Sequence, residues 1–154
     1  MAGDTMIVIL EAPLGSDLYQ RALSLREDIL RRPLGLTVTE AERSDDAMRQ
    51  HFCAVEYGKV VGTVSLRPLD ETTLHLKQMA VSQANRASRI GSRLMTHAEV
   101  WAAEAGFQLM IAHARIGAEG FYLKHGYAQE GETFMEQTIP HIRLAKTLIH
   151  RTLI

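Results

Sequence analysis

The segment from Leu74 to Ala105 constrains the fold most strongly, because a strand pattern, a basic loop and a long amphipathic helix follow one another there. The loop, residues 83–88 with sequence QANRAS, is too polar to lie in a core. A strand that enters a helix through such a loop directs backbone N–H groups and the positive helix end to one point. We therefore expect an anion site, with phosphate as the usual ligand. Apolar residues at helical spacing predict the buried stripe of the helix: Ile90, Leu94, Ala98, Trp101 and Ala105.

The strand part of this segment predicts an interruption of its regular pairing. Leu74 and Leu76 are apolar at even positions, whereas Met79 and Val81 are apolar at odd positions. A shift of one residue turns the core face of a strand to solvent unless a bulge absorbs it. We expect a bulge or a splay near residues 77–78. Splayed strands leave backbone N–H and C=O groups with which an extended ligand can pair.

The run Met79-Ala80-Val81, followed by residues 86–95 (RASRIGSRLM), resembles the acetyl-CoA signature of the GNAT N-acetyltransferases. The family pattern is Arg/Gln-x-x-Gly-x-Gly/Ala. Arg86 and Gly91 match its ends, whereas Arg89 stands where the family has its middle glycine. An arginine there can supply charge to pyrophosphate in place of close backbone approach. The resemblance implies acetyl-CoA as co-substrate, bound by Met79, Ala80, Val81, Arg86, Ala87, Ser88, Arg89, Ile90, Gly91, Ser92 and Phe121.

The composition is that of an ordinary globular protein. The 154 residues fit one domain over 1–154, with 46% hydrophobic and 23% charged residues. Because 17 Lys and Arg balance 18 Asp and Glu, we expect no nucleic-acid or membrane partner. No apolar run reaches the ~18 residues of a membrane span, and no signal peptide is recognisable. The single cysteine, Cys53, predicts a buried inert thiol and a reducing, cytoplasmic location.

The remaining segments predict an α+β fold. Residues 34–48 read as a loop with at most one turn of helix, and Gly58-Lys59 as a hairpin loop. The arginines at 26, 31 and 32 read as solvated charges near a helix end. The order β-α-β-β-β-α-β-α-β-β predicts a mostly antiparallel sheet with helices on both faces, which is also the GNAT order. The further strands expected are 6–10, 51–57, 60–66, 107–114, 127–134 and 142–149, and the further helices begin at Ser16 and at Ala118.

Residues 121–127 (FYLKHGY) resemble the second GNAT signature, F-Y-x-x-x-G-F/Y. In the family this tyrosine lies near the CoA sulfur and protonates the departing thiolate. The resemblance therefore implies that Tyr122 is a general acid, a role that a positioned phenol can fill. By spacing alone Tyr122 would be an amphipathic core tyrosine.

Residues 134–141 (FMEQTIPH) and 30–35 (LRRPLG) resemble segments of bacterial GNAT proteins of unknown activity. Glu136 and His141 are a pair that could bind or deprotonate an amine. Equally, Pro140 could fix a turn in which His141 only bonds to the backbone. His75 is expected on the polar side of its strand and His113 as a satisfied core histidine. The histidines show no metal-ligand spacing, so no metal is expected.

These patterns together predict an N-acetyltransferase that moves an acetyl group from acetyl-CoA to a primary amine by direct attack. The expected acceptor is a small-molecule or peptide amine, and homodimer formation is left open. Which residue serves as general base is also left open. The alternatives are an acyl-CoA sensor without catalysis and an interaction module that keeps the fold without the cofactor.

Overall fold

The computed structural model describes residues 6–84, 89–136 and 138–148. It divides into two compact units. The first unit comprises residues 1–67 and 78–98, and the second comprises residues 68–77 and 99–154. No helix in these described ranges has both the length and the apolar character that a membrane span requires.

The strands follow the hydrogen-bonded order β1-β2-β3-β4-β5-β8-β6, and β7 pairs with β8. The described registers are antiparallel except for β4 with β5, which is parallel. The α+β class and the mostly antiparallel sheet are thereby confirmed. The strands are β1 (Ile7–Glu11), β2 (Gln50–Glu56), β3 (Lys59–Pro68), β4 (Thr73–Val81), β5 (Leu109–Arg115), β6 (Ala128–Gln129), β7 (Phe134–Glu136) and β8 (Ile139–Thr147).

In the first unit, β2 and β3 form the predicted hairpin, but its turn lies one residue earlier than expected. Glu56 pairs with Lys59, so Tyr57 and Gly58 form the loop. Both have positive φ, at 50° and 76°. A two-residue turn of this kind matches the right-handed twist of the strands because both central residues are left-handed.

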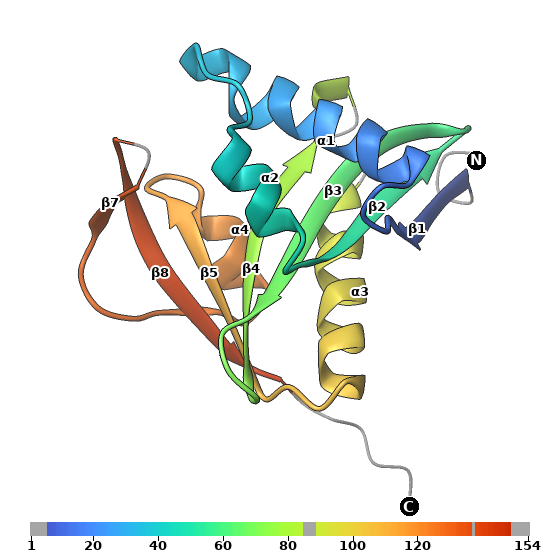
Figure 1. Cartoon of the computed structure of the whole chain (residues 1–154). Helices are drawn as coiled ribbons and strands as arrows, with labels where there is room; N and C mark the ends of the chain where they lie inside the picture. The colour runs from blue at the N-terminus through green and yellow to red at the C-terminus, as the bar shows by residue number, and fades with distance from the viewer. Residues whose placement is uncertain (1–5, 85–88, 137, 149–154) are drawn as a thin grey trace, which may run out of the picture. The chain divides into compact units, whose positions relative to one another are not determined.

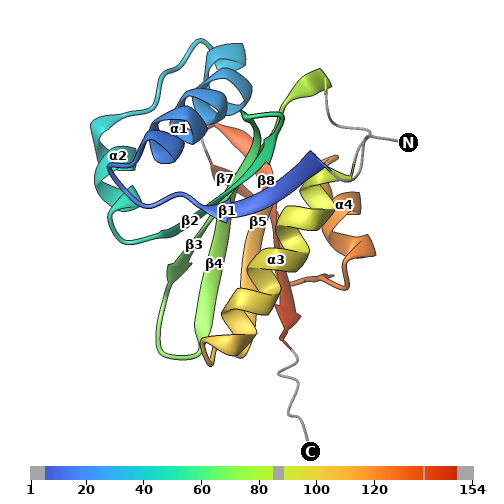
Figure 2. The ribbon, with the colours of Figure 1, turned by 90° about the vertical axis from the view of Figure 1, so that its right-hand side faces the viewer.

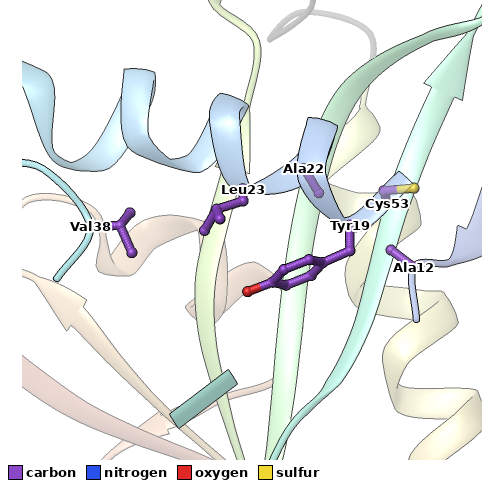
Figure 3. Packing of buried hydrophobic residues seen from close by; sticks show 6 residues of the cluster. All are labelled: Ala12, Tyr19, Ala22, Leu23, Val38 and Cys53. Atoms are coloured by element: carbon purple, nitrogen blue, oxygen red, sulfur yellow. The ribbon is translucent and has the colours of Figure 1, made fainter. Parts of the chain in front are cut away.

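Helix α1 (Asp17–Leu30) begins as predicted, with the Ser16 hydroxyl accepting a hydrogen bond from the Tyr19 N–H at 3.1 Å. It ends before the short 3-10 helix η2 (Arg32–Leu34), which contains Pro33. Helix α1 buries Tyr19, Ala22, Leu23 and Arg26. Figure 3 shows the resulting cluster, formed by Ala12, Tyr19, Ala22, Leu23, Val38 and Cys53. Burial raises the pKa of the Cys53 thiol, which agrees with an inert cysteine.

Helix α2 (Glu40–Asp46) occupies part of the segment expected to be mostly loop. A capping box starts it: the Thr39 hydroxyl accepts from the Glu42 N–H, and the Glu42 carboxylate accepts from the Thr39 N–H, both at 3.1 Å. This T-x-x-E signal is present in the sequence and was missed.

Two arginines expected to be solvated are instead buried in ion pairs of the first unit. Arg26 is only 3% exposed and contacts Asp46, while Arg31 pairs with Glu42. Only Arg32 is exposed, where it pairs with Asp28. The prediction failed because α2 brings acidic partners to α1, and a buried guanidinium is stable only when it is paired.

Helix α3 (Ile90–Glu104) packs within the first unit as far as Ala98. There it lies on the face of the strands opposite α1 (Figure 2). Gly62 of β3 permits this packing, since a Cβ there would lie 2.8 Å from Ile90 Cγ2 and 2.9 Å from Leu94 Cδ1. The register also shifts beside it, as expected for a glycine that marks a bulge. The predicted stripe is fully buried at Ile90, Leu94 and Ala98, but Trp101 is half-buried and Ala105 is exposed.

In the second unit, β5 pairs with β4 on one side and with β8 on the other (Figure 1). Helix α4 (Glu119–Lys124) follows β5. The predicted last strands are wrong in their bounds, since 127–134 contains only the short β6 and the start of β7. Strands β7 and β8 form a hairpin, in which Phe134 pairs with His141 and Glu136 with Ile139. Thr138 reverses the chain there with φ 60°, a local conformation that apolar periodicity does not report.

Candidate active site

The strand portion of the proposed cofactor site follows a backbone irregularity. Gln78 of β4 has φ 61°, at the place where a bulge or splay was expected. Its side chain is buried, and its Oε1 accepts a hydrogen bond of 2.8 Å from the Ser65 hydroxyl. The described pairing of β4 with β5 ends at Leu76 opposite Ala112, before Gln78. A left-handed residue interrupts a regular strand ladder.

The expected shift of the buried face of β4 from even-numbered to odd-numbered residues does not occur. Even-numbered residues remain the more buried ones through Gln78 and Ala80, whereas Met79 and Val81 are only half-buried. Burial at Gln78 is compatible with a polar side chain because Ser65 satisfies its carbonyl. Met79 and Val81 are therefore more exposed than core strand residues.

The helix portion of the proposed site begins with a second left-handed residue. Arg89 is exposed and has φ 60°, and its carbonyl accepts the Arg93 N–H at 3.0 Å at the start of α3. Ile90 is fully buried, while Gly91 and Ser92 are half-buried. A helix of this length carries a positive partial charge at its first turn, suited to an anion. Arg86, Ala87 and Ser88 lie outside the described residues.

The conformation of Arg89 explains why the family pattern has glycine at this position. A left-handed backbone is strained for any residue with a Cβ. We predict that Arg89→Gly raises the free energy of unfolding by up to about 1 kcal/mol, since glycine relieves this strain. Thermal and urea denaturation test the change.

Arg89→Gly should also weaken CoA binding and reduce its dependence on salt, because one cation is lost. Arg89→Lys is the matched control, since it retains both the charge and the strain. If the glycine variant binds CoA as tightly as the parent with the same salt dependence, Arg89 does not compensate by charge for the missing glycine.

Helix α4 carries the tyrosine of the second signature. The Tyr122 ring lies edge-to-face against Phe121, at 5.3 Å between centroids, and against Tyr127, at 5.8 Å. Burial raises the pKa of Tyr122 to about 12. Tyr127 is itself held by a 2.8 Å hydrogen bond from its hydroxyl to Glu99, whose other oxygen accepts from Lys146 at 2.8 Å. The Tyr122 ring therefore packs against Tyr127, which is itself held in place, and the Tyr122 hydroxyl keeps its proton at neutral pH.

Strands β5, β7 and β8 bring Glu136 together with two histidines. Its Oε1 lies 3.0 Å from Nδ1 of His113, and its Oε2 lies 3.8 Å from Nε2 of His141. The hydrogen bond from His113 lowers the pKa of Glu136 to about 2, and the nearby Lys77 also lowers it. Glu136 is therefore a carboxylate at neutral pH. A base this weak is poorly suited to deprotonate an ammonium, which favours amine binding over proton abstraction for this residue.

His141 forms the backbone contact considered as an alternative, together with its approach to Glu136. Its Nδ1 lies 2.7 Å from the Ile139 carbonyl and must donate to it, because a carbonyl oxygen only accepts. The side chain of His141 is 7% exposed. This burial limits its direct access to a bulky acceptor.

His113 differs from the prediction. It is half-buried rather than a core residue, and its partner is the Glu136 side chain. The His75 ring, from β4, lies 4.4 Å from the His113 ring between centroids. Sequence separation concealed this cluster, because β4, β5 and β7 come together only when the strands pair. Within the described residues, no group of three or more His, Cys, Asp and Glu side chains is arranged to hold a metal ion.

The proposed site residues fall in both units. Met79–Val81 and 89–92 belong to the first, whereas Phe121, Tyr122, Glu136 and His141 belong to the second.

A model of the acetyltransferase (GNAT) family matches residues 16–127, well over half of the chain. The chain belongs to the GNAT family. This GNAT protein is therefore an acetyltransferase. It is 34% identical over 114 residues to the uncharacterised N-acetyltransferase YitI of Bacillus subtilis, a match that covers 69% of this chain and 76% of the relative.

Two of the solved structures that share the fold of this GNAT protein contain coenzyme A or acetyl-CoA. One is an aminoglycoside 6'-N-acetyltransferase complexed with coenzyme A, with a TM-score of 0.77 at 19% identity over 94% of this chain and 99% of that chain. The other is a GNAT family acetyltransferase from Elizabethkingia anophelis with acetyl-CoA bound, with a TM-score of 0.72 at 18% identity over 94% and 99%. At these identities the likeness concerns the fold.

Proposed function

We propose that this GNAT protein transfers the acetyl group of acetyl-CoA to a primary amine, which attacks the thioester directly without a covalent enzyme intermediate. The observation that carries the proposal is the backbone of the first unit. There the irregular residue Gln78 precedes Met79–Val81, and the first turn of α3 follows left-handed Arg89. These are the two backbone features that the GNAT signature uses for an extended arm and a pyrophosphate.

In this proposal residues 86–92 hold the pyrophosphate, and the pantetheine arm pairs beside Met79–Val81. The positive end of α3 supports the first assignment, since phosphate oxygens accept hydrogen bonds from first-turn N–H groups. The interrupted β4 ladder supports the second, because a strand leaving its neighbour can pair with an extended ligand. A backbone N–H of the same strand would polarise the thioester carbonyl.

Tyr122 is proposed as the general acid for the CoA thiolate, with Phe121 as its cofactor-side neighbour. Its raised pKa supports a donor role, because the phenol stays protonated over the whole physiological range. The same burial would disfavour a free thiolate, which raises the proton affinity of the leaving sulfur and helps the transfer. Glu136 and His141 are proposed to bind the acceptor, for which the carboxylate supplies a counter-charge to an ammonium.

The proposal treats residues 1–154 as one acetyltransferase domain of the cytoplasm and leaves homodimer formation open. The acceptor class is a small-molecule or peptide amine. A related structure is named as an aminoglycoside acetyltransferase, which makes amino sugars one arm of a substrate panel. The other arms are polyamines, free amino acids and lysine peptides.

The experiment that tests the proposal combines calorimetry with a turnover assay. Acetyl-CoA binding is measured first, and thiol release with amide formation is then followed for each amine of the panel. Formation of an N-acetylated product supports the proposal. Tight binding without product from any amine favours an acyl-CoA sensor, and failure to bind CoA favours an interaction module.

Gly91→Val should weaken CoA binding by at least tenfold, about 1.4 kcal/mol. The reason is steric, since Gly91 is the second residue of α3 and a branched side chain there would obstruct phosphate approach to the helix end. Gly91→Ala is the graded control with a smaller expected loss. Unchanged calorimetric affinity in a valine variant with a parental circular dichroism spectrum would contradict the assignment of the phosphate site.

A further inference from the structure

The hydrogen bond between Glu136 and His113 determines which nitrogen of the imidazole carries a proton. Nδ1 of His113 lies 3.0 Å from Oε1 of Glu136. An ionised carboxylate can only accept a hydrogen bond, so Nδ1 must donate. In neutral His113 the lone pair therefore resides on Nε2, the nitrogen on the other edge of the ring.

Aromatic neighbours hold the His113 ring in position. The Phe134 ring lies edge-to-face at 4.8 Å between centroids, and the His75 ring is tilted against it at 4.4 Å. The His113 side chain nevertheless keeps 21% of its surface exposed, three times the 7% of His141. An oriented and accessible imidazole with a carboxylate behind it is the arrangement that activates a histidine base.

Resting on the proposed acetyl transfer, we propose that His113 is its general base, with Glu136 as the residue that positions it. Nε2 of His113 takes one proton from the acceptor ammonium, and Glu136 holds Nδ1–H and stabilises the imidazolium that forms. Two other groups of the cluster are less suited to this role. Glu136 is too weak a base, and His141 is more buried.

The proton balance of this step is complete. The ammonium R–NH₃⁺ loses one proton to Nε2, and His113 later releases it to solvent. The neutral amine forms a C–N bond to the thioester carbonyl carbon while the C–S bond breaks. The sulfur leaves as the thiol with the Tyr122 proton, and the second proton lost from nitrogen restores Tyr122 through solvent. One proton is released per acetyl group transferred.

The charged groups around His113 come from each neighbouring strand. Glu136 of β7 favours the imidazolium, whereas Lys77 of β4 and Arg143 of β8 oppose it. Arg143 stands directly opposite His113 in the strand pair, but its guanidinium bonds Glu130 at 3.3 Å. His75 and His141 also oppose the imidazolium when they are protonated. Of these groups, Glu136 is the one in hydrogen-bond contact with the His113 ring.

The test compares kcat/KM for an accepted amine from about pH 6 to pH 9.5 in the parent and in His113→Gln. We expect His113→Gln to lower kcat/KM at pH 7 by about tenfold to a hundredfold. In His113→Gln the logarithm of kcat/KM should rise with pH with a slope of one per pH unit, because only amine that is already neutral in solution can react. In the parent, kcat/KM should reach its plateau at a lower pH than in His113→Gln. An unchanged profile in His113→Gln overturns the proposal.

Two further measurements separate this inference from the proposed function. ¹⁵N NMR of the parent should show neutral His113 protonated on Nδ1, and Glu136→Gln should weaken that preference. Glu130→Gln is the matched control, because it removes an exposed carboxylate paired with Arg143. The Nε2–H tautomer in the parent overturns the base assignment whatever the activity. A parent that acetylates no amine overturns the proposed function, whereas acetylation with an unchanged His113→Gln profile overturns only this inference.

Discussion

Tyr122→Phe should lower kcat by about 10²–10⁴ while CoA affinity stays close to that of the parent. The substitution removes the only proton that the side chain can donate and keeps the ring that packs against Phe121 and Tyr127. A proton given to the departing thiolate is an interaction made in the transition state and not in the bound ground state. Its loss therefore appears in kcat.

Steady-state kinetics with acetyl-CoA and an accepted amine, together with calorimetry for CoA, measure the two effects of Tyr122→Phe. Tyr57→Phe is the matched control, because it removes the same hydroxyl from an exposed turn residue. Parental turnover in Tyr122→Phe would make Tyr122 a packing residue. A loss of affinity as large as the loss of rate would make it a binding residue.

Asp46→Ala should lower the free energy of unfolding by about 3–5 kcal/mol, because it leaves the buried Arg26 without a counter-charge. Asp46 is fully buried and accepts hydrogen bonds from Arg26 Nη1, at 3.1 and 3.2 Å, and from the Tyr19 hydroxyl, at 2.5 Å. Among the described residues, Nε and Nη2 of Arg26 have no hydrogen-bond acceptor. Within the described residues, Asp46 is thus the ion-pair partner of the Arg26 guanidinium.

Chemical denaturation of the parent, Asp46→Ala and Asp46→Asn measures this cost. The asparagine variant keeps an oxygen that can accept from Tyr19 but loses the charge, so an intermediate cost is expected. Asp28→Ala is the control on α1, the helix that carries Arg26, since the pair of Asp28 with Arg32 is exposed and is expected to contribute about 0–1 kcal/mol. Equal costs for Asp46→Ala and Asp28→Ala would show that the Arg26–Asp46 pair contributes no more than a surface contact.

Local sequence patterns predicted the elements that carry the site. The strand, loop and helix of 74–105, the Ser16 cap and the helix bearing Tyr122 all depend on interactions within a few residues. The irregularity near Gln78 lies where the apolar pattern of the sequence changes phase, although the buried face of the strand does not change there. The T-x-x-E box of α2 was equally local and could have been found.

Other predictions failed where a partner lies far away in the chain. The arginines of α1 were read as solvated, yet Arg26 and Asp46 are 20 residues apart and buried together. His113 was read as a core histidine, yet it bonds Glu136 across 23 residues. Periodicity identifies which face of an element is apolar, but it does not identify which side chain of the neighbouring element that face contacts.

By itself, the sequence determined the α+β class, most of the order of elements and the positions of Met79–Val81, Gly91 and Tyr122 along them. Hydrophobic periodicity, capping and short motifs are sufficient for this because they act over one strand or one helical turn. Only the tertiary structure decided that Arg89 is left-handed and that Glu136 serves as hydrogen-bond partner of His113. The physical reason is that backbone conformation at a junction and contacts between strands depend on how distant elements pack, and this packing sets the charge and tautomer of the groups it brings together.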